Sequence, residues 1–306
     1  MPIAEAKKIW HNGKLVDWHE AKVHVLTHAL HYGSGVFEGI RCYETAKGPA
    51  VFRLRDHIKR LFYSAKIYFM QIKYSEDELC NAVKETIRIN NLRACYIRPI
   101  VYRGYGEMGL NPLKCPVEVA ICCWPWGTYL GEDALKNGVR VKISSFQRIS
   151  CNACPPNAKA TGQYINSILA KVEAINCGYE EAVLLDSRGM VSECTGENIF
   201  IVKNGALYTP PQHAAILPGI TRASIIEIAR ELKYEVHEVD ITRGMIYSCD
   251  EAFITGTAAE VVPIREIDGI TIGQPGPITK KLQGTFFDIV KGKNKRYLKW
   301  LDFVSS

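Results

Sequence analysis

Apolar residues recur with helical spacing in several stretches of the chain. One stretch covers about residues 56–70, and another covers about 76–90 after the capping box Ser75-Glu-Asp-Glu78. Further helices are predicted at about 163–176, after Leu217-Pro-Gly-Ile-Thr221, and from Pro277 to Gly292. The stripe of the first helix consists of Ile58, Leu61, Phe62, Ala65 and Phe69. Arg60 lies roughly opposite this stripe, so the pattern alone predicts a solvated side chain.

Strand patterns occupy much of the remaining chain. Asn12-Gly13 and Asn204-Gly205 each separate two short apolar runs, which predicts two hairpins. Other strands are predicted at 95–103, 117–124, 139–144, 181–186, 190–193, 198–203 and 251–255. Because the strands come in hairpins and not in regular βαβ alternation, we expect an α+β fold.

The length of 306 residues suggests two domains. Turn residues cluster between Pro125-Trp126-Gly127 and Asn137-Gly138. We therefore expect a smaller α+β domain at 1–125, a connection at 126–137 and a larger α+β domain at 138–306.

Composition indicates an ordinary globular protein with a net charge of +6. The N-terminal residues have no apolar signal segment, and no long uncharged apolar run follows. Most of the 11 cysteines lie within apolar runs. We expect a soluble cytoplasmic protein that does not bind membranes or nucleic acid. Cys151-Asn-Ala-Cys154 is interpreted as two free thiols, with a strained, reducible disulfide as the alternative hypothesis.

Two motifs suggest ligands but lack the necessary context. Gly104-Tyr-Gly106-Glu-Met-Gly109 matches a dinucleotide fingerprint, yet the following Leu-Asn-Pro-Leu-Lys-Cys-Pro cannot begin the required helix. His24, His28 and His31 have no acidic or thiol neighbours in the pattern, so we expect no metal site.

The strand at 95–103 is more informative. Alternation places Tyr96, Arg98, Ile100 and Tyr102 on one face, where a phenol beside a guanidinium could bind a carboxylate. A solvated outer face is the alternative. Pro99 suggests that this strand lies at an edge or a bulge.

Two turns could bind phosphate, and one lysine could attack a carbonyl. The segment Leu217-Pro-Gly-Ile-Thr221 precedes a helix, and Gly256-Thr257-Ala258 follows a strand, but either could be simple capping. Lys159 stands among small residues that could desolvate its amine, although the local pattern also fits a surface lysine.

Taken together, these segments resemble the fold-type IV pyridoxal-phosphate enzymes, and within them the bacterial branched-chain amino-acid aminotransferases. The resemblance runs nearly end to end. Its most specific segments are His31-Tyr-Gly-Ser-Gly-Val-Phe-Glu-Gly-Ile-Arg41, Tyr96-Ile-Arg-Pro99, Met108-Gly-Leu-Asn-Pro112, Ala158-Lys-Ala160 with Gly162-Gln-Tyr164, Glu193 with Gly196-Glu-Asn198, Leu217-Pro-Gly-Ile-Thr-Arg222 and Gly256-Thr-Ala-Ala-Glu260. It implies a two-domain architecture with the site at the domain and dimer interface, and with the cofactor lysine in the larger domain.

The resemblance also assigns residues. Lys159 would form the internal aldimine with pyridoxal 5'-phosphate, and Glu193 would meet the pyridine nitrogen. The other cofactor contacts would be Arg60, Tyr164, Leu217, Ile220, Thr221 and Thr257. Substrate contacts would be Phe37, Trp126, Tyr129 and Ala258, and a second subunit would contribute the part of the pocket formed by Tyr32, Tyr96, Arg98 and Leu110. A homodimer at least is therefore implied, with a hexamer built of dimers as a further possibility.

The activity implied is reversible, ping-pong transfer of the amino group of L-leucine, L-isoleucine or L-valine to 2-oxoglutarate, as in branched-chain amino-acid biosynthesis. Alternatives on the same fold are a D-amino-acid or (R)-amine transaminase and an aminodeoxychorismate lyase, and a basic binding protein is the alternative outside it. Cys151, Cys154, Thr161 and Cys194 depart from the family pattern near the cofactor residues.

Overall fold

The computed structural model describes residues 3–127 and 130–304, so Tyr129 lies outside the described residues. The chain forms two compact units. The first comprises Met1–Gly127, Ala158–Gly162 and Asp288–Ser306, and the second comprises Thr128–Asn157 and Gln163–Phe287. The segment that carries Lys159 thus packs with the first unit, whereas the sequence led us to expect it in the larger second domain.

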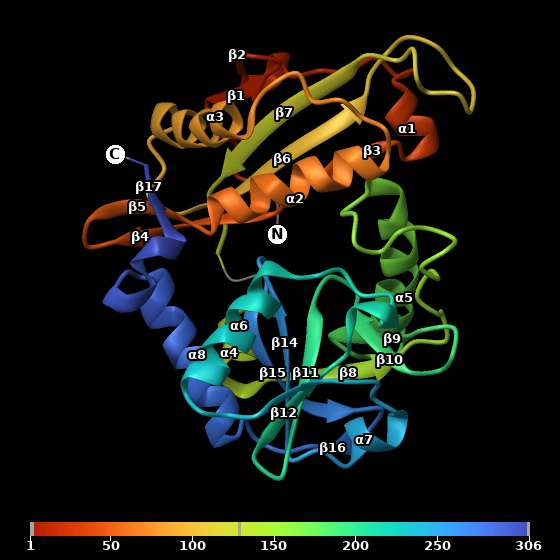
Figure 1. Ribbon diagram of the computed structural model, residues 1–306, viewed down its shortest axis with the longest axis vertical. Coiled ribbons are helices and arrows are strands. Elements are labelled where there is room, and N and C mark those ends of the chain that lie inside the picture. The colour runs from red at the N-terminus through yellow and green to blue at the C-terminus, as the bar shows by residue number, and fades with distance from the viewer. Residues whose placement is uncertain (1–2, 128–129, 305–306) are drawn as a thin grey trace. The chain divides into compact units, whose positions relative to one another are not determined.

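The first unit contains an eight-stranded antiparallel sheet in the order β17-β5-β4-β6-β7-β1-β2, with β3 also paired to β6 (Figure 1). Its strands are β1 (Lys8–His11), β2 (Lys14–Asp17), β3 (Gly35–Phe37), β4 (Ile40–Thr45), β5 (Gly48–Phe52), β6 (Cys95–Arg103), β7 (Val117–Trp124) and β17 (Leu301–Phe303). The predicted Asn12-Gly13 hairpin joins β1 to β2, and the two predicted strands at 95–103 and 117–124 are β6 and β7.

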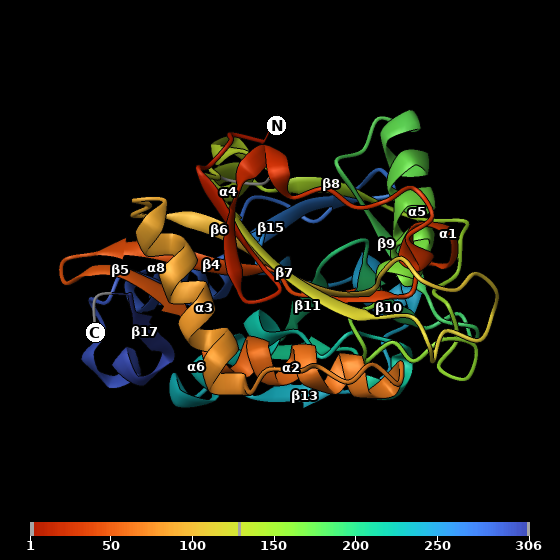
Figure 2. The ribbon, with the colours of Figure 1, turned by 90° about the horizontal axis from the view of Figure 1, so that it is seen from above.

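Two helices, α2 (Leu54–Ile67) and α3 (Glu76–Ile89), cover one face of this sheet (Figure 2). Their apolar stripes supply Ile58, Leu61, Leu79 and Val83 to the core. The predicted capping box begins α3, because Ser75 accepts from the Glu78 backbone and Glu78 accepts from the Ser75 backbone. The short helix α1 (His28–Tyr32) was not predicted.

The expectation that Pro99 marks an edge or a bulge is wrong. Strand β6 is internal, with β7 on one side and β4 and β3 on the other. The register is regular, since Phe37 pairs with Ile100 and Ile40 pairs with Ile97. Pro99 accepts from the Glu38 amide at 2.8 Å but has no N–H to return, so the ladder is interrupted between β3 and β4.

The second unit contains a nine-stranded mixed sheet in the order β10-β9-β8-β15-β14-β11-β12-β13, with β16 paired to β15. Its strands are β8 (Val139–Ile143), β9 (Glu181–Leu185), β10 (Val191–Cys194), β11 (Asn198–Lys203), β12 (Ala206–Thr209), β13 (Val236–Glu238), β14 (Glu251–Gly256), β15 (Glu260–Ile267) and β16 (Ile270–Thr271). The predicted Asn204-Gly205 hairpin joins β11 to β12.

The helices of this part of the chain are α4 (Glu132–Asn137), α5 (Tyr164–Asn176), α6 (Ile220–Glu231), α7 (Arg243–Tyr247) and α8 (Pro277–Val290). Helix α6 packs against β14 (Figure 1). In the described part of the chain, no helix combines the length and apolarity needed to cross a membrane. The sheets and helices confirm the predicted α+β class.

Candidate functional site

The backbone around Lys159 is fixed on both sides. The Phe37 amide donates to the Lys159 carbonyl at 3.0 Å, and Val36 and Ala160 form a β-bridge. The Lys159 amide donates to Ser64 Oγ at 3.0 Å. The lysine Nζ lies 5.0 Å from the centre of the Phe37 ring. The amine is thus carried on a rigid backbone beside an aromatic face.

A buried acid lies close to this segment in the first unit. Glu38 is fully buried and accepts from Arg60 Nε at 2.6 Å, from Arg60 Nη2 at 2.9 Å and from His57 Nδ1 at 2.7 Å. Burial alone would raise the pKa of Glu38, but Arg60 and His57 outweigh it and hold that pKa well below its usual range. Burial lowers the pKa of His57, although Glu38 opposes this shift.

These contacts correct the pattern-based prediction for Arg60, whose side chain is 11% exposed and not solvated. His57, Arg60 and Ser64 occupy successive turns on one side of α2. Sequence reasoning missed His57, Ser64 and Glu38. The helical spacing of the three polar positions was a usable signal, but no local pattern links them to Glu38, which precedes α2.

The predicted face of β6 brings Tyr96 and Arg98 together. The Arg98 guanidinium lies 4.7 Å from the Phe37 ring centre and 5.3 Å from that of Tyr96. Trp126 contacts Tyr96 edge-on, with ring centres 4.2 Å apart. Arg98 Nε is buried and has no hydrogen-bond partner among the described residues. An aromatic wall with an available cationic donor suits a ligand that is both apolar and a carboxylate.

Other predicted substrate residues lie elsewhere. Tyr32 and Leu110 are on the surface of the first unit, 44% and 87% exposed. Ala258 is half-buried in the turn between β14 and β15 of the second unit.

In the second unit, Glu193 at the end of β10 is the centre of a buried network. Arg148 Nη2 lies 2.9 Å from Oε1, and Oε2 accepts from the Leu217 amide at 2.9 Å and from Asn198 Nδ2 at 3.1 Å. Asn198 also donates to the Leu217 carbonyl at 2.9 Å. The carboxylate is therefore structurally fixed, and Glu193 is not an ordinary solvated residue at the end of a strand. Arg148 was not predicted.

The same network shapes the start of α6. A Cβ on Gly219 would lie 2.0 Å from Asn198 Oδ1, so this position requires glycine. Gly219 is the N-cap and gives no side-chain cap to the helix, while Ile220 and Thr221 are buried in the first turn. The N–H groups of such a turn attract an anion. Thr257 follows β14 in a separate half-buried turn, and Tyr164 begins α5.

The remaining motifs differ in outcome. The 104–109 segment leads into a loop that continues to β7, which confirms that it begins no helix. His28 contacts Ser34 Oγ at 2.7 Å and the Gly109 carbonyl at 2.8 Å through its two ring nitrogens. Cys194 is buried, and burial raises the pKa of its thiol well above the usual value.

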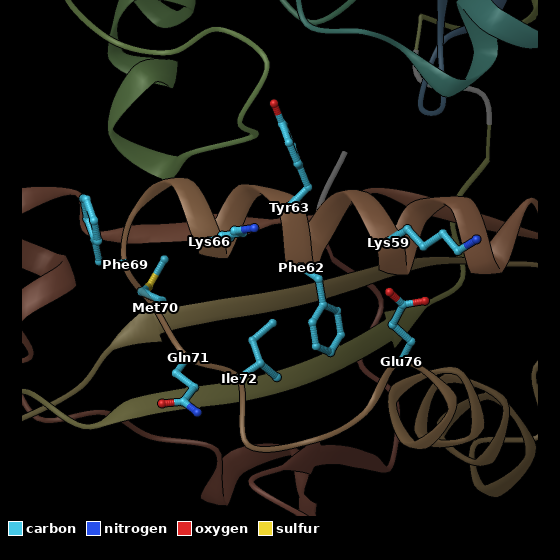
Figure 3. Close-up of a pocket in the computed structure, with 9 residues that line it drawn as sticks. All are labelled: Lys59, Phe62, Tyr63, Lys66, Phe69, Met70, Gln71, Ile72 and Glu76. Carbon is cyan, nitrogen blue, oxygen red and sulfur yellow. The ribbon is translucent and has the colours of Figure 1, made fainter.

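A surface hollow of about 590 Å³ lies beside α2, with Phe62, Met70 and Ile72 in its lining (Figure 3). Lys59 and Lys66 of α2 also line it. It contains none of the predicted site residues, and we assign it no role.

Comparisons with known proteins agree closely with one another. The profile of the family described as Amino-transferase class IV matches residues 35–267. A "Branched-chain-amino-acid aminotransferase" of Pseudomonas aeruginosa is 51% identical over 298 residues, which cover 97% of each chain. The Escherichia coli enzyme of that name has a crystal structure with a TM-score of 0.96, 48% identity and coverage of 98% of this chain and 100% of that one. The branched-chain amino acid aminotransferase of Thermobaculum terrenum, crystallised in its PLP-form, has a TM-score of 0.93, 36% identity and coverage of 98% of both chains.

Proposed function

The chain belongs to the class IV aminotransferases, and from this premise we propose which residues perform its reaction. It is a pyridoxal-phosphate-dependent enzyme that transfers the amino group of L-leucine, L-isoleucine or L-valine to 2-oxoglutarate, reversibly and by a ping-pong mechanism. One observation carries the assignment of roles. The Phe37 ring contacts both the Lys159 amine and the Arg98 guanidinium, so an amine and a carboxylate-binding group meet at one aromatic surface.

The donor groups of the chain fit pyridoxal phosphate. A phosphate needs cationic and N–H donors, which Arg60 and the glycine-capped start of α6 can supply. A pyridine nitrogen that must stay protonated needs a fixed carboxylate, and Glu193 is buried and held by Arg148. We assign Arg60, Ile220, Thr221 and Thr257 to the phosphate, Leu217 to the ring face, Tyr164 to the phenolic oxygen, Glu193 to the pyridine nitrogen and Lys159 to the carbonyl carbon. When bound, the cofactor supplies that carbonyl and an electron-accepting ring.

The protein's own groups then control two protons. With the cofactor bound, Lys159 Nζ would remove the proton from the substrate Cα and later return one. Glu193 would favour the protonated pyridine nitrogen through its negative charge. Because Glu193 accepts three hydrogen-bonded or ionic contacts from the protein, it can do so without moving.

Substrates of different polarity share the aromatic wall. The branched side chains would pack on Phe37 and Trp126, whereas the second carboxylate of glutamate would bind Arg98, whose Nε is otherwise unused among the described residues. Tyr96 provides apolar ring surface and keeps Arg98 in place through a 3.4 Å contact between Nη2 and the phenol oxygen. We propose no role for Tyr129 beyond the one the family resemblance suggests.

We also propose that the enzyme is a homodimer, and helix α5 supports this. Ile165, Ile168, Leu169, Val172 and Ile175 form an outward stripe, each 45% to 62% exposed. The charged residues of the same helix point inward, since Lys171 binds Glu181 at 2.7 Å and Glu173 binds Ser144 at 2.5 Å. A helix with inward charged residues and outward apolar residues is expected to bury its apolar side against a second copy of the chain. The exposed Tyr32 and Leu110 would then be available to the partner's site.

Dimerisation can be tested on α5 itself. Ile168→Glu should convert the dimer to monomer in sedimentation-velocity ultracentrifugation at micromolar concentration, while Asn176→Glu on the same helix should not. An Ile168→Glu variant that remains dimeric would show that this helix face is not the interface.

We place the enzyme in the cytoplasm. All eleven cysteines are described and none of them is in a disulfide, as suits a reducing compartment.

The cofactor assignment is tested by borohydride reduction of the yellow protein, followed by peptide mapping. The label should appear on Lys159, and Lys159→Ala should lose turnover by at least about 10²-fold. Lys66→Ala, on exposed α2 surface, is the matched control and should retain activity and label. Label on another lysine would overturn the assignment. A panel of L- and D-amino acids and (R)-amines separates this activity from the related transaminases.

A further inference from the structure

Cys151 and Cys154 lie in one turn of helical geometry. The Ala153 amide donates to the Ser150 carbonyl at 3.0 Å, and the Cys154 amide donates to the same oxygen at 3.1 Å. Three residues apart in such a turn corresponds to a Cα–Cα distance of about 5 Å. Disulfides span roughly 4.4–6.8 Å between Cα atoms, so the turn is compatible with a bond between these thiols.

The two thiols differ from most other cysteines in accessibility. Cys151 is exposed and Cys154 is half-buried, whereas seven others are buried. Burial raises the pKa of Cys80, Cys122 and Cys249 to about 11, which keeps those thiols protonated and unreactive. Cys177 is also exposed, but it ends α5 and is not part of this turn.

The surface around Cys151 has room for a small reagent. One hollow of about 260 Å³ has Cys151, Pro155 and Gln212 in its lining, and a second of about 220 Å³ has Cys151, Asn152 and His213. Cys151 Sγ lies 3.9 Å from the His213 carbonyl at the side of this surface. A low-molecular-weight disulfide could therefore reach Cys151 without unfolding of the turn.

We propose that Cys151 and Cys154 are a modification site at which a reversible intrachain disulfide forms by exchange with a low-molecular-weight disulfide. The Cys151 thiolate attacks one sulfur of that disulfide, a mixed disulfide forms, and one small thiol leaves. The Cys154 thiolate then attacks Cys151 Sγ and expels the second small thiol. The two protein thiols lose two electrons and two protons, and the small disulfide is reduced to two thiols. This inference does not depend on the proposed function.

The bond would lock a segment that adjoins the cofactor residues in the chain. Arg148, which holds Glu193, precedes Cys151 by three residues, and Lys159 follows Cys154 by five. Closing the turn would remove conformational freedom from the stretch that joins these two residues.

The experiment is equilibration of the full-length protein in glutathione buffers of graded redox ratio, followed by acid quenching, differential alkylation and peptide mapping. We expect Cys151 and Cys154 to be oxidised together, with loss of two hydrogens and no glutathione adduct. Cys154→Ser should instead accumulate one glutathione on Cys151. Cys177→Ser is the matched control and should leave the oxidation of the pair unchanged.

Two outcomes would overturn the proposal. One is a wild-type protein in which glutathione stays attached to Cys151, because Cys154 then fails to resolve the mixed disulfide. The other is a pair that stays reduced under conditions that modify Cys177. Both readouts come from the thiols themselves, so they hold whatever substrate the enzyme prefers.

Discussion

Glu38 in the first unit and Glu197 in the second are both buried carboxylates, yet their pKa values move in opposite directions. Glu38 contacts Arg60 and His57, and its pKa falls well below the usual range. Burial and the neighbouring Glu181 raise the pKa of Glu197 to about 8, and Lys171 only partly opposes this. Burial therefore does not determine the protonation state of an acid by itself. Burial raises the pKa of both acids, but only Glu38 has cationic partners that outweigh it, so Glu38 is ionised and Glu197 is neutral near pH 7.

The largest effect should come from removing the charge of Glu38. Glu38→Gln removes the carboxylate that binds the Arg60 guanidinium, and breaking a buried pair in this way costs about 3–5 kcal/mol. We expect urea unfolding to show this loss of stability. Cofactor titration should show weaker binding, because Glu38 no longer fixes the position of the Arg60 side chain. Glu85→Gln, on the exposed side of α3, is the control. An unchanged urea midpoint for Glu38→Gln would mean that Arg60 finds another partner.

The pH dependence of stability should reveal the opposite behaviour of Glu197. The pKa of Glu197 is higher in the folded state than in the unfolded state. Its contribution to the free energy of unfolding is therefore fully present below about pH 4.5 and is lost as the pH rises through about 8. Glu197→Gln mimics the neutral acid, so its free energy of unfolding should lack this part of the decline with pH. The difference in free energy of unfolding between wild type and variant, measured by urea unfolding, should change by on the order of 3 kcal/mol between pH 5 and 9. Parallel curves for the two proteins would contradict the raised pKa.

Glu193 is a test of charge within the proposed site. Glu193→Gln keeps the size of the side chain but removes the charge that protonates the pyridine nitrogen. We expect the half-reaction with L-leucine to slow by roughly 10²-fold in stopped-flow spectra, with a larger deuterium isotope effect at Cα. The Lys159 label after borohydride should persist. Wild-type half-reaction rates would assign the pyridine partner to another residue.

The smallest effect should be at a surface pair of the first unit. Glu44 and Arg93 lie 2.7 Å apart, but their side chains are 53% and 66% exposed. Solvent screens such pairs, so Glu44→Gln should cost about 0–1 kcal/mol in the same urea assay. If Glu44→Gln lowered the free energy of unfolding as much as Glu38→Gln does, buried and exposed ion pairs would not differ in their effect on stability.

Local pattern was sufficient for much of the fold. Strands β6 and β7 have the predicted bounds, because alternation and flanking turns define them within a few residues. The capping box of α3 was equally local. Short elements such as β3, β13 and α7 were missed, since their three to five residues are defined by partners distant in sequence.

The candidate site was predicted less completely for the same reason. Tyr96 and Arg98 were found because both lie on one strand, whereas the placement of Arg60 depends on Glu38 and that of Glu193 depends on Arg148. Helical periodicity shows which side of a helix is apolar and buried, but it does not show whether a residue distant in sequence supplies an opposite charge. The roles of Lys159 and the phosphate residues came from family resemblance and not from pattern.

The interruption beside Pro99 also restricts how this sequence can evolve. Gly39 lies in that gap, and a Cβ there would come within 2.0 Å of the Tyr96 hydroxyl oxygen. The residues at positions 39 and 96 therefore cannot change independently. Among descendants of this chain, a residue larger than glycine should be accepted at position 39 only after Tyr96 has been replaced by a smaller residue. The steric clash thus determines the order of the two substitutions, whatever their effect on activity.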